Sequence, residues 1–137
     1  MGFKILIVDE CPLARSAMAT AAVALEGFNA IGVASGFEAL KLLPRDQFDL
    51  VIFDLHTQDI DALELLNFVK KSPKYRQTPM FLTAKVDEAP TRARGKALGA
   101  AEFLIKPLEA AALQELLRTY LHREERRTGR RRDQRQS

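Results

Sequence analysis

Short apolar runs alternate with longer segments of helical spacing along the first 122 residues of this 137-residue chain. The runs hold four to seven residues, are rich in β-branched and aromatic types, and each is followed or ended by a polar residue. This pattern is typical of buried strands. The predicted strands cover residues 3–8, 28–34, 49–53, 80–83 and 102–105.

The segments between these runs carry the start and stop signals of helices. Pro12 suits a first helical position, Gly27 suits a C-terminal cap, and Ser35 with Glu38 has the spacing of a capping box. The signal is weakest in segment 87–98, which contains Gly95 and has alanines as its main apolar residues. The predicted helices cover residues 12–26, 36–43, 60–71, 87–98 and the stripe of leucines and Tyr120 within 113–121.

Regular alternation of strand and helix predicts an α/β protein with a doubly wound parallel sheet and helices on both faces. In such sheets, ligands bind outside the carboxyl ends of the strands. The residues at those ends are Asp9, Glu10, Asp54, Thr83 and Lys106. The sequence thus places carboxylates, a hydroxyl and an amine at one edge of the sheet, where they suit phosphate chemistry.

The carboxylates at this edge need a counterion. With a strand order of 2-1-3-4-5, the first and third strands are neighbours at about 4.8 Å, which brings Asp9 close to Asp54. Two charges about 4 Å apart repel by about 4 kcal/mol at an effective dielectric of 20, and Glu10 adds to this repulsion. Mg²⁺ is the natural partner, because it takes oxygen ligands and uses only one or two carboxylates. Asp54 is then a candidate nucleophile toward phosphorus, with Lys106 and Thr83 supplying a positive charge and a hydrogen bond.

Four segments at these strand ends resemble the receiver domain of two-component response regulators, the CheY-like family. They are ILIVDE at 5–10, VIFD at 51–54, FLTA at 81–84 and GAAEFLIKP at 99–107, in the family's order and spacing. The resemblance covers about residues 3–121. It implies a flavodoxin-like (βα)5 fold with strand order 2-1-3-4-5.

The resemblance also assigns roles to the residues at the metal and acceptor positions. Asp9 and Glu10 correspond to the acidic metal pair, and Asp54 corresponds to the phosphorylated aspartate. His56 would give its backbone carbonyl to the metal. The implied cofactor is Mg²⁺, bound by Asp9, Glu10, Asp54 and the His56 carbonyl.

A second group of positions matches the part of the family that stabilises the phosphoryl group and switches. Thr83 corresponds to the switch threonine, Ala84 to the small residue that keeps the site open, and Phe103 to the aromatic switch. Lys106 corresponds to the invariant lysine, and the Lys106–Pro107 bond is expected to be cis. Asp54, Lys106 and Thr83 would together carry the transfer.

The loop after Asp54 departs from the family pattern. Receivers usually have Met-Pro three and four residues after the phosphorylated aspartate and a glycine further on, where this chain has Thr57, Gln58 and Ala62. His56 and Lys85 occupy two variable positions that the family associates with the rate of dephosphorylation. We therefore expect an unusual phosphoryl lifetime, of unspecified direction.

The implied function is that of a single-domain response regulator. It would take a phosphoryl group from a sensor histidine kinase or phosphotransfer protein onto Asp54, catalysing only its own loading and hydrolysis. Output would be protein binding through helix 87–98, strand 102–105 and the last helix. One alternative is a phosphorylation-independent module with the same fold. Another is a haloacid-dehalogenase-like phosphohydrolase using Asp9, although Cys11 stands where that class has a second aspartate.

Charge divides the chain into a receiver domain at 1–122 and a basic tail at 123–137, which we expect to be disordered. Residues 118–137 carry eight arginines against three acids, a net charge of +5, whereas the remaining residues sum to −2. The tail has no aromatic residue for stacking on bases, so nucleic-acid binding through residues 123–137 is a third and less favoured alternative. A single cysteine excludes an internal disulfide, and no apolar run is long enough to span a membrane. We expect a cytoplasmic protein.

Overall fold

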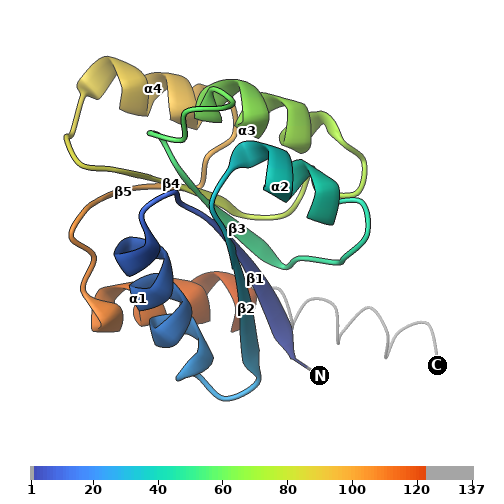
Figure 1. Ribbon diagram of the computed structural model, residues 1–137, viewed down its shortest axis with the longest axis vertical. Coiled ribbons are helices and arrows are strands. Elements are labelled where there is room, and N and C mark those ends of the chain that lie inside the picture. Colours follow the sequence, from blue (N-terminus) through green and yellow to red (C-terminus); the bar gives the residue numbers. More distant parts are fainter. Residues whose placement is uncertain (1, 123–137) are drawn as a thin grey trace.

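Five parallel strands form one sheet in the order β2-β1-β3-β4-β5, as Figure 1 shows. The computed structural model describes residues 2–122, so the predicted basic tail at 123–137 lies outside the described residues. The strands are β1 (Phe3–Val8), β2 (Phe28–Val33), β3 (Leu50–Asp54), β4 (Met80–Ala84) and β5 (Glu102–Ile105). The helices are α1 (Pro12–Val23), α2 (Gly36–Leu42), α3 (Ala62–Lys71) and α4 (Ala89–Ala97), followed by a C-terminal helix that includes residues 110–122. The predicted fold and strand order are confirmed.

Local side-chain chemistry explains where the helices begin and end. Pro12 occupies the first turn of α1, and the hydroxyl of Ser35 accepts the Glu38 N–H at 3.2 Å, as the capping signals predict. Helix α1 ends at Val23, three residues earlier than predicted, because the chain needs residues 24–27 to turn back into β2. Gly27 makes that turn with a φ of 82°. Helix α3 begins two residues later than predicted, because the Asp61 carboxylate accepts the N–H groups of its first turn.

The sheet separates two apolar cores. Alternate residues of the central strands face α2, α3 and α4 on one side, and α1 with the C-terminal helix on the other (Figure 1). The buried residues of the first core include Leu6, Val8, Val51, Phe53, Leu66 and Leu82. Those of the second include Ile5, Ile7, Met18, Ile52, Phe81 and Leu117. Because β1, β3 and β4 are covered on both faces, their carboxyl ends are rigidly placed.

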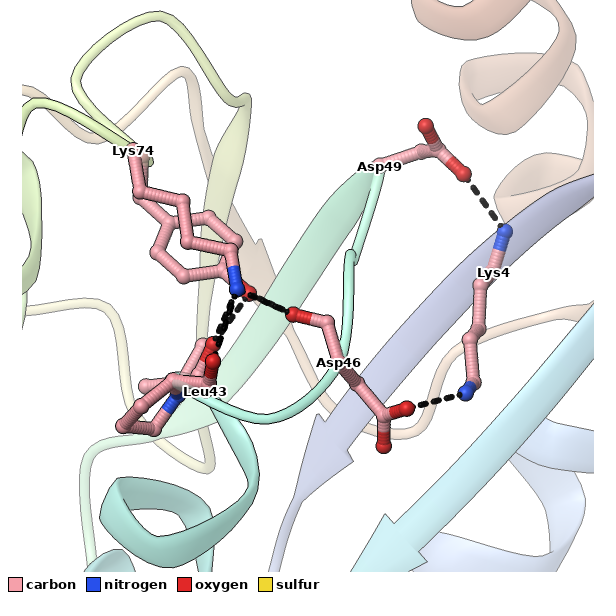
Figure 2. Close-up of polar contacts among 7 residues, drawn as sticks. Lys4, Leu43, Asp46, Asp49 and Lys74 are labelled. Carbon is pink, nitrogen blue, oxygen red and sulfur yellow. Dashed lines mark hydrogen bonds and ion pairs between the residues drawn. The ribbon is translucent and has the colours of Figure 1, made fainter.

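A polar network joins two loops at the amino ends of the central strands, on the side of the sheet away from the carboxyl ends. Figure 2 shows the Lys74 ammonium against the loop that follows α2, where it donates to the carbonyl oxygens of Leu43, Pro44 and Asp46 at 2.7–3.1 Å. The buried Tyr75 hydroxyl lies 2.6 Å from the Leu43 oxygen and 2.7 Å from the Asp46 oxygen. These donors satisfy the carbonyl of Leu43, which caps α2, and two carbonyls of the loop that follows it.

Helix α4 is the least buried of the labelled helices. Gly95 is its single buried residue, and a Cβ atom at this position would lie 2.7 Å from Leu82 Cδ1 of β4. The glycine that weakens the helical signal in the sequence is therefore the point where α4 approaches the sheet most closely. No helix within residues 2–122 is long and apolar enough to cross a membrane.

Candidate functional site

The carboxyl ends of four strands converge on one cluster of charged and polar side chains. Asp9 follows β1, Asp54 ends β3, Thr83 lies near the end of β4, and Lys106 follows β5. The parallel register places Asp54 directly beside Thr83. The order of the strands thus brings together residues that lie far apart in the sequence, as predicted.

Lys106 lies between the two buried carboxylates. Its Nζ atom is 2.5 Å from Asp9 Oδ2 and 2.9 Å from Asp54 Oδ1. The peptide bond that joins Lys106 to Pro107 is cis, as expected. One ammonium therefore faces two carboxylates, which leaves the cluster with a net negative charge.

The Asp54 carboxylate has polar partners at both oxygens. The Thr83 hydroxyl donates to Oδ1 at 3.0 Å, and the backbone N–H of His56 donates to Oδ2 at 3.1 Å. Asp54 is only 3% exposed and Thr83 is fully buried. Hydrogen bonding fixes the direction of the carboxylate, while its burial makes any approaching charge interact strongly with it.

The protonation of Lys106 follows from its surroundings. Partial burial lowers the pKa of its ammonium, but hydrogen bonds and charge attraction from Asp9 and Asp54 outweigh that effect and raise the pKa above its usual value of 10.5. Lys106 is therefore a fixed positive charge at neutral pH. It can stabilise an anionic group held against Asp54.

The remaining predicted site residues surround this cluster at different depths. Ala84 is buried at the end of β4, and Phe103 is partly buried on β5, where it pairs with Leu82 and packs against the first core. Glu10 and His56 are exposed. The structure thus brings Asp9, Asp54, Thr83 and Lys106 into direct contact, whereas Glu10 and the His56 side chain lie outside that set.

The chemistry of the donors fits a hard divalent cation. Asp9 Oδ2 and Asp54 Oδ1 both lie within 2.9 Å of one ammonium, so the two carboxylates already converge on one positive charge. Carboxylate and carbonyl oxygens are the ligands that Mg²⁺ prefers. Within residues 2–122, no three His, Cys, Asp or Glu side chains come together closely enough to form a metal cluster by themselves. Glu10 and the His56 carbonyl would supply the further oxygen ligands that the family resemblance implies.

The loop after Asp54 makes contacts that sequence reasoning missed. The Asp59 carboxylate accepts the backbone N–H groups of Gly36 and Phe37, at 3.1 and 2.9 Å, and so caps the start of α2. The Thr57 hydroxyl donates to the Ile60 carbonyl at 3.0 Å. The loop that departs from the family pattern is therefore held by hydrogen bonds of its own. The acid-rich run from Asp59 to Asp61 is the one sequence signal that could have indicated capping.

Residues 5–118 match the response regulator receiver domain family. The response regulator protein FleR of Pseudomonas aeruginosa is 31% identical over 117 residues, which cover 85% of this chain and 24% of FleR. The transcriptional regulatory protein TrcR of Mycobacterium tuberculosis is 32% identical over 120 residues, which cover 88% of this chain and 46% of TrcR. The chain thus spans less than half the length of these relatives.

Solved structures show the same arrangement of strands and helices. The chemotaxis response regulator CheY4 of Vibrio cholerae superimposes with a TM-score of 0.79 and 26% identity, covering 88% of this chain and 99% of CheY4. A CheY-like receiver domain protein of Methanospirillum hungatei reaches a TM-score of 0.84 at 21% identity, covering 93% of this chain and 99% of that protein. The second likeness concerns the fold alone.

Proposed function

The chain belongs to the response regulator receiver domain family, and on that premise we propose that Asp54 accepts a phosphoryl group from a histidine kinase or a phosphotransfer protein. The observation that carries the proposal is the contact of Asp54 with both Lys106 and Thr83. These are the two donors that a phosphoryl group on Asp54 would need. The family match leaves the phosphohydrolase alternative without support.

The transfer itself is a displacement at phosphorus. An oxygen of the Asp54 carboxylate forms a bond to phosphorus while the bond between phosphorus and the donor imidazole nitrogen breaks, and that nitrogen keeps the electron pair. Asp9, Asp54, Glu10 and the His56 carbonyl would hold Mg²⁺, which when bound screens the negative charge of the incoming group. Lys106, already charged, then pairs with a phosphoryl oxygen.

Signalling would follow from redirected hydrogen bonds. Thr83 now donates to Asp54 Oδ1, and a phosphoryl oxygen at that place would take the hydroxyl as its own donor. Movement of Thr83 would free space for Phe103, which lies on the neighbouring strand and is only partly buried. We infer that the surface formed by α4, β5 and the C-terminal helix then changes its affinity for a target protein.

The loading step is tested by intact mass. The full chain and its Asp54→Asn variant are incubated with Mg²⁺ and acetyl phosphate, a small phosphoryl donor. We expect one added phosphoryl group on the wild type and none on the variant, and none on either protein when EDTA replaces Mg²⁺. Equal loading of the variant would refute the acceptor assignment. Absence of loading on both would favour the phosphorylation-independent module.

A further inference from the structure

The backbone of Asp9 is held by an arginine that lies outside the cluster described above. Arg15 stands in the first turns of α1, and its Nη1 atom donates to the Asp9 carbonyl oxygen at 2.8 Å. The side chain of Asp9 is held separately, because Oδ1 accepts the Cys11 N–H at 2.9 Å and Oδ2 faces Lys106. Asp9 is thus fixed at its carbonyl and at both carboxylate oxygens.

The carbonyl contact matters most for the next residue. The Asp9 carbonyl belongs to the peptide group that joins Asp9 to Glu10, so Arg15 fixes the plane of that peptide. Within the described part of the chain, the Glu10 carboxylate is exposed and has no hydrogen-bond or ion-pair partner. Its direction relative to Asp9 therefore depends on the backbone, which Arg15 restrains.

A glycine on the neighbouring strand makes room for this arginine. Gly32 lies on β2, and a Cβ atom there would lie 2.7 Å from Arg15 Cγ and 3.0 Å from Arg15 Cδ. Those atoms belong to the middle of the side chain, so any larger residue at position 32 would displace the whole arginine. Arg15 and Gly32 are therefore structurally matched to each other.

We propose that Arg15 is a positioning residue that sets the Mg²⁺ affinity of the site by orienting Asp9 and Glu10. The inference rests on the magnesium site of the proposed function. The direction in which Mg²⁺ affinity changes when Arg15 is removed tests the inference, because a positive charge beside a cation site would by itself weaken cation binding. If positioning dominates, removal of Arg15 weakens Mg²⁺ binding. If simple charge repulsion dominated, the same removal would strengthen it.

The test measures Mg²⁺ binding to the full chain by titration calorimetry, without any phosphoryl donor. Partners that orient metal ligands typically contribute about tenfold or more to affinity, so we expect Arg15→Ala to raise the Kd about tenfold. Gly32→Ala, which retains the arginine but displaces it, should raise the Kd in the same direction. The double variant should bind like Arg15→Ala alone, because Gly32 acts only through the arginine. Arg76→Ala removes an exposed arginine elsewhere and serves as the charge-matched control.

Two further readouts separate positioning from a general structural defect. Thermal unfolding in EDTA should differ little between the control and Arg15→Ala, whereas the rise in Tm on adding Mg²⁺ should be smaller for Arg15→Ala. The rate of loading at saturating Mg²⁺ should be retained, with only the half-saturating concentration increased. Unchanged or tighter Mg²⁺ binding by Arg15→Ala, or additive effects in the double variant, would overturn the inference alone. Absence of Mg²⁺ binding by the wild type would overturn both the inference and the proposed metal site.

Discussion

Lys106 and Asp9 are 97 positions apart in the chain, yet Lys106 Nζ lies 2.5 Å from Asp9 Oδ2. The contact crosses the carboxyl edge of the sheet from the end of β5 to the end of β1 and also encloses Asp54. A single ammonium thus offsets part of the repulsion between two buried carboxylates. The stability and the chemistry of this edge are consequently linked.

Replacing Lys106 by Met should destabilise the protein. The variant keeps most of the aliphatic stem but leaves Asp9 and Asp54 without their shared cation, and loss of one partner of a buried ion pair typically costs about 3 kcal/mol in the free energy of unfolding. Denaturant unfolding in EDTA at neutral pH measures the loss.

The raised pKa of Lys106 sets the upper pH limit of this prediction. A lysine whose folded-state pKa lies above the unfolded value contributes stability that is complete below the unfolded pKa, near 10.5, and is lost as pH rises through the folded pKa. The wild type should therefore lose this contribution only above about pH 10.5. A variant as stable as the wild type at pH 7 would contradict the ion-pair account.

Asp54→Asn should stabilise the protein in the absence of Mg²⁺, in contrast to Lys106→Met. The substitution removes one of two carboxylate charges from a buried position while Asp9 keeps Lys106 as its partner. Replacing a buried charge in this way is often neutral or stabilising, and we expect a gain of about 1 kcal/mol in EDTA. The stabilisation that Mg²⁺ gives the wild type should be reduced in the variant. Lower stability of Asp54→Asn in EDTA would show that the ion pairs outweigh the repulsion.

Asp59→Ala should produce a pH-dependent loss of stability. Slight burial raises the pKa of Asp59, but hydrogen bonds from Phe37, Gly36 and Ile60, with one from its own backbone, outweigh it and lower the pKa below 3.8. An acid with a depressed folded-state pKa contributes stability above the unfolded value and loses it as pH falls through the folded pKa. The variant should lose about 1 kcal/mol at pH 7, as for loss of a helix cap. The difference from wild type should narrow below about pH 4; a gap that persists at pH 2 would contradict the charged cap.

Gly95→Ala tests how α4 is held. In an exposed helical position this change stabilises a helix by about 1 kcal/mol. Here the new Cβ would lie 2.7 Å from Leu82 Cδ1, so α4 or Leu82 must move and we expect a loss of about 1 to 3 kcal/mol. Denaturant unfolding gives the sign, and NMR shift changes should concentrate in α4 and β4. A stabilised variant would mean that α4 accommodates the extra methyl group freely.

Much of the candidate site could be predicted from the sequence. The alternation of strands and helices predicts a parallel sheet, and strand order then places Asp9, Asp54, Thr83 and Lys106 at one edge. The resemblance of four segments supplies the expected roles. The structure places these four side chains in contact but leaves Glu10 exposed.

The contacts that could not be predicted come from loop side chains and close packing. Asp59 caps a helix more than 20 residues away, and Arg15 reaches a backbone carbonyl across the start of its own helix. Neither contact has a periodic signal, because each depends on how two elements happen to approach. Gly95 weakens the helical signal of α4, although the structure uses it for packing against Leu82. Helix propensity alone does not predict that position 95 needs a small residue for packing against β4.

The most direct test of the central claim is to locate the phosphoryl group. The chain loaded with acetyl phosphate and Mg²⁺ is treated with borohydride, which reduces an acyl phosphate of aspartate to homoserine, and the peptides are sequenced by mass spectrometry. We predict homoserine at position 54, dependent on both the donor and Mg²⁺. Homoserine at position 9, or an unmodified Asp54 in protein that has gained phosphate, would contradict the account.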